Sequence, residues 1–450
     1  MFGRLNAFPV RRWYTGYSYL DGMGENRAKM LKAARRVAAL AASSAEAERA
    51  DEALARALVE RQAARQAAAL EGKELPAEPR RRALLIINTK SGPNDDSILQ
   101  VRPLVLMLAK NGIDAEVRVK LRKRQARNDA RRFAKKGYPL VIAAGGDGTI
   151  EAVARGLVGT RATLGIVPLG TYNNLATALG IPTDLAEAVA LIAAGPTRLV
   201  DVGEVRVAGR TKKKPFFEMV TMGVAAAAMP AGQEAKDGNW GAAAGLLPAV
   251  AEMPMAAATV RLDEAEPRRA ETLLVTVSNS PRAAAALEMA PAGRLDDGLL
   301  DVAVYRGMAQ PALALHFAAK ATVGEPEDGR IERARARRVE VVAEPPLPVA
   351  ADSKVIGTTP ARIKVLPSAL RVVCGHGAGL NLPVSDALVN AATAEARRSP
   401  PPAVAPTADQ GPGVGERAAA VAGAVASGVA SAAVAFVESR VLGQPEHEPE

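Results

Sequence analysis

Hydrophobic and polar positions between residues 83 and 198 follow two patterns in turn. Short uninterrupted apolar runs, such as 140–144, are typical of strands buried on both faces of a parallel sheet. A stretch with apolar residues at helical spacing follows, as in 150–157, and it ends near Gly159. Strands and helices that alternate in this way predict an α/β domain with a parallel sheet covered by helices. Its strands are expected at 83–88, 114–120, 140–144 and from 162 onward.

The pattern changes near residue 199. From there, runs such as "VDVGEVRV" and "ETLLVTVSN" alternate apolar and polar residues, and Gly, Pro and Asp separate them. This pattern predicts a second, mainly antiparallel β domain over residues 199–377, with a last strand that can return to the first domain.

The two ends of the chain differ from both domains. Residues 1–82 combine an aromatic, basic segment with a long Ala-rich helix, and residues 378–450 combine a Pro-rich linker with a second Ala-rich helix. Residues 418–437 carry no charge and are long enough to span a membrane. They consist mostly of Ala, Gly and Ser, so a loosely packed or surface-lying helix is favoured over a span.

Charge is concentrated in one segment. Residues 80–136 hold sixteen Lys or Arg against five Asp or Glu, an excess of eleven that accounts for the net charge of +10. The densest part, 120–137, predicts a basic helix that is either simply solvated or attracted to a polyanion such as nucleotide phosphates or an acidic membrane surface. Nucleic acid is the least favoured partner, because no stacking aromatics interleave the basic residues.

The cysteine and histidine content bears on disulfide formation, on a cysteine nucleophile and on metal binding. Cys374 is the single cysteine, which excludes an intramolecular disulfide and fits a reducing compartment. It is interpreted as a small buried hydrophobic residue rather than a nucleophile. The three histidines are scattered and form no metal-binding spacing.

A glycine-rich turn joins the strand at 140–144 to the helix that follows. It reads Gly145, Gly146, Asp147, Gly148, Thr149. Glycines let the backbone lie against a ligand, and the N–H groups that open the helix favour an anion, so the turn suits phosphate. A tight turn without a ligand is the alternative. A carboxylate inside a phosphate cradle is repulsive unless a cation intervenes, and on that reasoning Asp147 favours a ligand with a cation.

Two other turns are expected at the same edge of the sheet. Asn88, with Ser91 and Gly92, ends the first strand, and "PLGTYNN" (168–174) ends a later one. The second turn brings Thr171, Asn173 and Asn174 to the carboxyl ends of the strands, where open α/β sheets bind their ligands.

Four motifs together resemble the diacylglycerol kinase catalytic domain family, which includes sphingosine and ceramide kinases and bacterial lipid kinases. The family forms N-P-x-S-G, G-G-D-G-T, P-x-G-T-x-N-D and D-D-G-x-L-D-V match "NTKSG", "GGDGT", "PLGTYNN" and "DDGLLDV" in order, from about Ala83 to Val373. The resemblance implies a two-domain α/β lipid-kinase-like fold, with an N-terminal parallel nucleotide-binding domain (83–198) and a C-terminal antiparallel β-sandwich (199–377). It also implies ATP in the cleft between the domains and transfer of its γ-phosphate to a lipid hydroxyl.

The family's site residues carry over by motif. The resemblance places nucleotide phosphates on Gly145, Gly146, Asp147, Gly148 and Thr149, with Thr171, Asn173 and Asn88 nearby. It places Mg²⁺ on the Asp297 carboxylate with backbone oxygens of Arg294 and Leu299, which are the hard oxygen ligands that magnesium requires. Taken alone, the same residues also fit a turn that enters a hairpin strand.

The chain departs from the family at the expected catalytic base. Members commonly carry a D-G-E triplet whose glutamate is thought to accept the proton. Here the triplet is Asp352, Ser353, Lys354, and Ala152 stands where the helix after the glycine turn usually has glutamate. Asp147 or Asp352 is expected to take over as base, with Asp147 favoured.

Three readings of the function follow. The first is an ATP- and Mg²⁺-dependent lipid kinase, with diacylglycerol as acceptor, that works in the cytoplasm at the anionic inner face of the membrane. The second is a catalytically degenerate relative that binds nucleotide or lipid and regulates, which Lys354 and Ala152 favour. The third, a kinase for a soluble small molecule, is disfavoured by the basic first lobe and the aromatic N-terminus. The sequence does not predict an oligomeric state.

Overall fold

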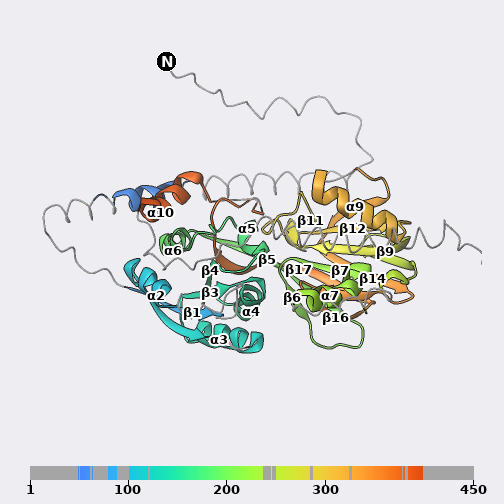
Figure 1. Ribbon diagram of the computed structural model, residues 1–450, viewed down its shortest axis with the longest axis horizontal. Helices are drawn as coiled ribbons and strands as arrows, with labels where there is room; N and C mark the ends of the chain where they lie inside the picture. Colours follow the sequence, from blue (N-terminus) through green and yellow to red (C-terminus); the bar gives the residue numbers. More distant parts are fainter. Residues whose placement is uncertain are drawn as a thin grey trace, which may run out of the picture.

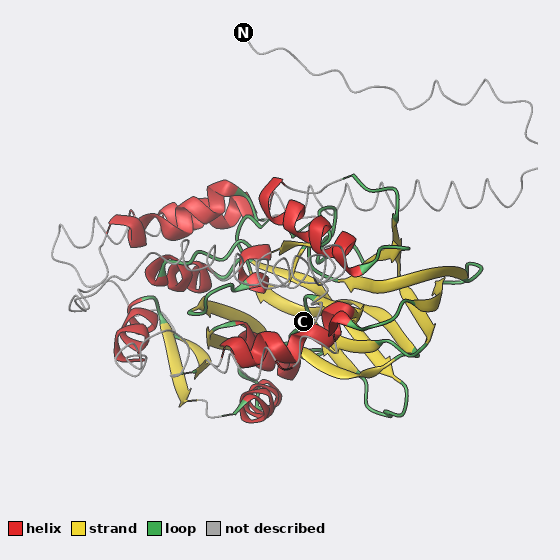
Figure 2. Ribbon diagram, turned by 45° about the vertical axis from the view of Figure 1, so that its right-hand side comes forward, coloured by secondary structure: helices red, strands yellow, loops and turns green. Residues whose placement is uncertain are grey.

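The structure is a computed structural model. It describes residues 49, 51–60, 63, 80–88, 101–119, 122–236, 245, 250–283, 287–323, 327–377, 379–380 and 384–398. Within these ranges fifteen strands form one continuous mixed sheet, parallel at one end and antiparallel at the other (Figure 1). Figure 2 shows the long antiparallel strands on one side and most of the helices around the shorter parallel strands.

The parallel half holds four strands in the spatial order β2-β1-β3-β4. They are β1 (Arg81–Ile87), β2 (Ile113–Val119), β3 (Leu140–Gly145) and β4 (Thr163–Pro168). Five helices belong to this half: α2 (Val101–Lys110), α3 (Lys123–Lys135), α4 (Asp147–Leu157), the short α5 (Asn174–Ala178) and α6 (Leu185–Ala194). All six residues of β3 are buried, which explains why its sequence shows no alternation.

Two long strands join the halves. β5 (Thr197–Val207) and β17 (Ala361–Val373) pair along most of their length in antiparallel register. Near its end β17 also pairs in parallel with β4, through Arg371 and Val372, while its beginning pairs with β14 (Arg338–Glu344) of the antiparallel half. The predicted boundary at residue 198 therefore falls inside β5, and the two halves share a backbone connection at two strands.

The antiparallel half carries the remaining strands. They are β6 (Lys214–Phe216), β7 (Met219–Gly223), β8 (Ala256–Leu262), β9 (Arg268–Ser278), β12 (Leu300–Arg306), β13 (Ile331–Ala336), β15 (Pro348–Ala351) and β16 (Lys354–Thr358). A separate small hairpin pairs β10 (Arg282–Ala283) with β11 (Leu287–Glu288), and helices α7 (Val224–Lys236) and α9 (Gln310–Val323) belong to this half (Figure 1). The core of this sheet is aliphatic apart from Phe216, in keeping with the low aromatic content. The parallel α/β half and the antiparallel β half confirm the predicted fold class.

One helix corrects the prediction of a tail after residue 377. α10 (Asp386–Arg398) packs on α6, and Leu388, Ala391 and Ala392 belong to the core of the parallel half. Its buried residues are Leu388, Ala391, Ala392 and Thr393, so a single large apolar side chain marks this face in the sequence.

Part of the N-terminal extension is described too. Residues 51–60 are helical, and the buried Asp51 carboxylate accepts hydrogen bonds from Arg198 at 2.6 Å and from the Ser385 N–H at 3.0 Å. The helix therefore binds both β5 and the segment before α10. The aromatic segment and residues 418–437 lie outside the described residues. Among the described helices none is both long and apolar enough to cross a membrane.

Candidate active site

The glycine turn follows β3 directly and opens α4. Gly145 has φ +154°, and a Cβ there would lie 2.8 Å from Thr149 Oγ1, so the turn needs glycine at this position. Gly146 caps α4 in extended conformation without a side-chain hydrogen bond. The first N–H groups of a helix have no partner within it, and the turn thus presents the anion-binding end of α4 at the carboxyl edge of the sheet.

The second turn packs against the first. A Cβ on Gly170 would lie 2.5 Å from Gly146 Cα, so glycine at 170 lets the two backbones touch. Asn173 adopts a left-handed conformation at φ 48°. Its side chain bonds the N–H and the carbonyl of Gly170, at 3.1 and 2.6 Å, and this fixes the shape of the turn.

Asp147 holds the two turns together. Its Oδ1 accepts from the Asn174 N–H at 2.9 Å and its Oδ2 from the Asn173 N–H at 3.2 Å. These two backbone donors offset part of the charge of the carboxylate, and the expectation from the sequence that a cation accompanies Asp147 stays a prediction. Both oxygens are engaged, which favours a positioning role for Asp147 over proton abstraction.

The other residues expected here have different surroundings. Asn88 lies at the end of β1, where its N–H donates to the Ala144 carbonyl at 3.0 Å, one residue before the glycine turn. Thr171 is exposed at the tip of the second turn. Ser91 and Gly92 lie outside the described residues.

A lysine from the basic helix lies over the glycine turn. A Cβ on Gly148 would lie 2.7 Å from Lys123 Nζ, which places this ammonium group directly against the turn. The close approach of α3 to α4 positions it, since a Cβ on Gly156 would lie 2.4 Å from the Arg127 carbonyl oxygen. Sequence reasoning identified the basic run as a possible polyanion partner but did not single out Lys123.

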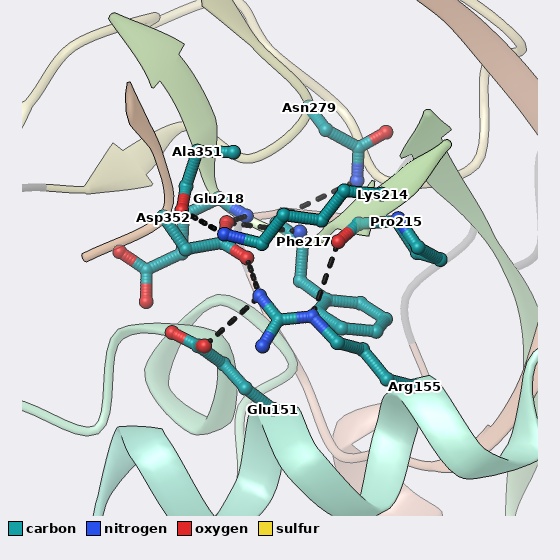
Figure 3. Close-up of polar contacts among 9 residues, drawn as sticks. All are labelled: Glu151, Arg155, Lys214, Pro215, Phe217, Glu218, Asn279, Ala351 and Asp352. Atoms are coloured by element: carbon teal, nitrogen blue, oxygen red, sulfur yellow. Dashed lines mark hydrogen bonds and ion pairs between the residues drawn. The ribbon is translucent and has the colours of Figure 1, made fainter. Parts of the chain in front are cut away.

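A buried charge cluster lies where α4 meets the antiparallel half (Figure 3). Arg155 of α4 donates to Asp352 Oδ2 at 2.5 Å and to the Pro215 carbonyl at 3.1 Å, and its guanidinium is 3.1 Å from Glu151 Oε2. Asp352 Oδ1 accepts from the N–H groups of Phe217 and Glu218, at 3.1 and 3.0 Å. The cluster thus joins the two halves through side chains.

Asp352 has little freedom to act as a base. Its side chain is 1% exposed, both oxygens accept hydrogen bonds, and its φ of 51° is left-handed. Lys354, at the glutamate position of the family triplet, is exposed at the start of β16 and makes no ion pair among the described residues.

Burial and neighbouring charge shift several pKa values in this cluster. Burial, with the nearby Asp352 charge, raises the pKa of Glu151 to about 7. Burial lowers the pKa of Lys214, which donates to the Ala351 carbonyl at 3.0 Å, to about 8. Burial also raises the pKa of Glu218 well above its usual range, and the negative charges of Asp352, Asp147 and Glu151 add to the effect.

Sequence reasoning missed Glu218, Arg155 and Lys214. A usable signal existed for Glu218, which stands within the otherwise apolar stretch "PFFEMVTMG" and so marks a buried charge. Arg155 and Lys214 gave no such signal, because a basic residue on a helix or at a strand end is usually solvated.

The residues expected to hold magnesium lie before β12. Asp297 Oδ1 accepts from the Leu299 N–H at 2.9 Å, and its Oδ2 is 3.6 Å from Arg335 Nη1. Burial raises the pKa of Asp297. Arg294 donates to the Gly293 carbonyl at 2.8 Å. The loop has carboxylate and backbone oxygens, the ligand type that a hard cation prefers, and Arg335 is the present counter-charge of Asp297. The described residues form no group of three or more His, Cys, Asp or Glu side chains suited to a metal.

Comparison with known proteins agrees with this architecture. A diacylglycerol kinase catalytic domain model matches residues 82–205, and a model described as a YegS C-terminal NAD kinase beta sandwich-like domain matches residues 218–374. A diacylglycerol kinase structure from Bacillus anthracis str. Sterne superposes with a TM-score of 0.52 at 24% identity, over 66% of this chain and 97% of that one, which supports the fold.

Curated relatives give the family. A probable lipid kinase YegS-like of Klebsiella pneumoniae (strain 342) is 32% identical over 303 residues, 64% of this chain and 94% of the relative. The lipid kinase YegS of Escherichia coli (strain K12) is 30% identical over 235 residues, 50% of this chain and 74% of that protein. The two family matches and the superposition together define the two-domain fold of the diacylglycerol kinase type. Within that class, the chain belongs to the family of YegS-like lipid kinases.

Proposed function

We propose that this protein transfers the γ-phosphoryl group of ATP to the hydroxyl of a membrane lipid, with diacylglycerol as the first candidate acceptor. The observation that carries the proposal is the pair of packed turns clasped by Asp147, which forms a rigid backbone surface at the anion-binding end of α4. The names of the relatives support the lipid as acceptor, and the diacylglycerol kinase match supports the choice of lipid.

The chain's own groups suit the phosphates of a nucleotide. The backbone N–H groups of Asp147 and Gly148 open α4 and are proposed to bind the phosphates, whereas the Thr149 N–H donates to the Gly146 carbonyl at 2.8 Å; Lys123 adds a positive charge over Gly148. Thr171, Asn173 and Asn88 remain the residues proposed to complete the nucleotide site. Phosphoryl transfer depends mainly on positioning and charge stabilisation, which a rigid, basic cradle supplies.

Magnesium is proposed at Asp297 with the backbone oxygens of Arg294 and Leu299. Bound there, the ion would hold this loop in shape, since the carboxylate already orders Leu299. A competing attraction to Arg335 has to be released or shared for the ion to bind.

A lipid acceptor requires the protein to work at a membrane surface. The excess positive charge over residues 80–136 is attracted to an anionic bilayer, and exposed basic residues line α3. We accordingly propose a cytoplasmic enzyme that is peripheral at the inner face.

The second candidate function is a degenerate relative that binds nucleotide or lipid without transfer. Lys354 favours it, because the family glutamate is replaced by an exposed residue of opposite charge.

An acceptor panel separates the two candidates. The protein is incubated with γ-labelled ATP, magnesium and mixed micelles of diacylglycerol, ceramide or sphingosine, beside Asp147→Ala and Lys354→Glu. Label in diacylglycerol with the wild type, lost in Asp147→Ala, is expected. If only Lys354→Glu labels a lipid, the wild type is the degenerate relative that binds without transfer. If neither the wild type nor Lys354→Glu labels a lipid, the kinase proposal is overturned.

A further inference from the structure

Glu218 is a buried acid to which the motifs assign no role. It lies between β6 and β7 and is 7% exposed. Its Oε2 accepts one hydrogen bond, from Asn174 Nδ2 at 2.9 Å, whereas Oε1 receives none from any described residue. A buried carboxylate normally has a cation or several donors around it, and no described cation forms an ion pair with Glu218. Its surroundings therefore leave the Oε1 oxygen of Glu218 available to accept a hydrogen bond or a proton from a bound ligand.

Two contacts fix Glu218 beside the glycine turn and the second turn, which are proposed to bind the phosphates. Asn174 donates through its side chain to Glu218 and through its backbone N–H to Asp147. Glu218 is therefore linked through one residue, Asn174, to the carboxylate that joins the two turns. On the other side, the backbone N–H of Glu218 donates to Asp352 Oδ1 at 3.0 Å. Figure 3 shows Glu218 beside Asp352, next to the segment where relatives are expected to carry the base.

Asn174 departs from the family form P-x-G-T-x-N-D, in which this position is an aspartate. An aspartate at 174 would place a second carboxylate against Glu218, whereas the amide of Asn174 donates to it. The amide oxygen of Asn174 is buried and has no hydrogen-bond partner among the described residues. It is therefore available to accept from a hydroxyl group brought in by a ligand.

The electrostatic setting suits a proton acceptor. The charged groups with the largest effect on Glu218 are Asp352, from the turn between β15 and β16, and Asp147 and Glu151 of α4, and all three are acidic. Arg155 and Lys214 are occupied with Asp352, Glu151 and the Ala351 carbonyl. Burial and these charges raise the pKa of Glu218, so its ionised form binds a proton more strongly than an exposed carboxylate does.

We propose that Glu218 is the general base of the transfer reaction and replaces the glutamate that Lys354 displaces. In this step the lipid hydroxyl oxygen forms a bond to the γ-phosphorus of ATP, while the bond from that phosphorus to the β–γ bridging oxygen breaks and its electron pair leaves with ADP. The hydroxyl proton passes to a Glu218 oxygen and is later released to solvent. The inference rests on the proposed kinase function.

The test compares Glu218→Gln with the wild type. The variant keeps the size of the side chain and an oxygen that can accept from Asn174, and Glu264→Gln, at a site with an 85% exposed side chain, is the matched control. Removal of a general base lowers the rate about 10²- to 10⁴-fold. We expect Glu218→Gln to lower kcat with diacylglycerol by at least about 100-fold, with unchanged ATP affinity and thermal unfolding, and to remove the acidic limb of the pH–rate profile.

Each other outcome is decisive. An active wild type with Glu218→Gln within about threefold of it, or slowed with its acidic limb intact, overturns the assignment and leaves the kinase proposal standing. A wild type that binds ATP yet labels no lipid overturns the kinase proposal, and the assignment falls with it.

Discussion

Arg155 satisfies three acceptors that lie on two halves of the molecule. Its guanidinium pairs with Asp352 and Glu151 and donates to the Pro215 carbonyl, and its side chain is 16% exposed. Two buried carboxylates depend on this one cation together with Lys214. At the scale of single residues, this cluster sets how α4 meets the antiparallel half.

Arg155→Met is expected to destabilise the protein by about 3–5 kcal/mol, because it leaves buried carboxylates without their counter-charge. The matched control is Arg132→Met, which removes an exposed pair with Asp129 and is expected to cost about 0–1 kcal/mol. Urea unfolding of the three proteins measures the difference. Equal losses in the two variants would show that the Arg155 cluster contributes no more than a surface pair.

Glu151 makes stability depend on pH. Its pKa in the folded protein is about 7, above the usual glutamate value of 4.5, so the folded state holds more protons than the unfolded chain between these values. Stability from this group is therefore present at low pH and is lost as pH rises from about 4.5 to 7. The loss is of the order of 1–3 kcal/mol.

Glu151→Gln is expected to flatten this dependence, since the amide does not titrate and Arg155 keeps its pair with Asp352. Urea unfolding at pH 5 and pH 8 gives the slope, with Glu264→Gln as the control that should leave it unchanged. A slope in Glu151→Gln as steep as in the wild type would place the titration elsewhere.

At the scale of elements, the nucleotide edge depends on two turns that touch. Gly170→Ala places a Cβ within 2.5 Å of Gly146 Cα, and neither backbone can yield without moving its turn. We expect ATP affinity to fall about tenfold or more, equivalent to about 1.4 kcal/mol, while the rest of the fold persists. Isothermal titration calorimetry measures the affinity.

Gly232→Ala in α7 is the control for that measurement, because a Cβ there meets nothing within 4 Å. If Gly170→Ala bound ATP as tightly as Gly232→Ala does, the packed turns would not form the nucleotide surface.

The elements also show what sequence patterns can and cannot reveal. The strand at 140–145 and the turn after it were predictable, because buried parallel strands and glycine turns leave local signals. α10 was not, since Leu388 is the one large apolar side chain among its buried residues and its partner α6 is far away in sequence. Separation along the sequence also hid the contacts of the two aspartates. Asp147 accepts from the Asn173 N–H, 26 residues away, and Asp352 accepts from the Phe217 N–H, 135 residues away. Motif matching named these aspartates, but only the fold shows that their oxygens are engaged.

At the scale of the whole molecule, one sheet runs through both halves. β5 and β17 carry the backbone across, and the Arg155 cluster ties the halves through side chains. The site proposed between them is thus held from both sides, and positive charge is concentrated on the parallel half alone.

This charge predicts salt-sensitive membrane binding. The protein is expected to sediment with vesicles that contain anionic lipid at low ionic strength and to be released at about 0.5 M salt, where charges are screened within a few ångströms. Vesicles of neutral phosphatidylcholine are the control. Equal binding to both vesicle types, or none to the anionic ones at low salt, would contradict a peripheral, charge-driven association.

We propose that the protein as a whole serves phosphoryl transfer from ATP to a lipid hydroxyl. Its most direct test is a time course with purified wild-type protein, γ-labelled ATP, magnesium and diacylglycerol micelles, in which ADP and labelled lipid are quantified together. We expect the two products to form in equal amounts. Formation of ADP with the label only in inorganic phosphate, or no turnover at all, would contradict it.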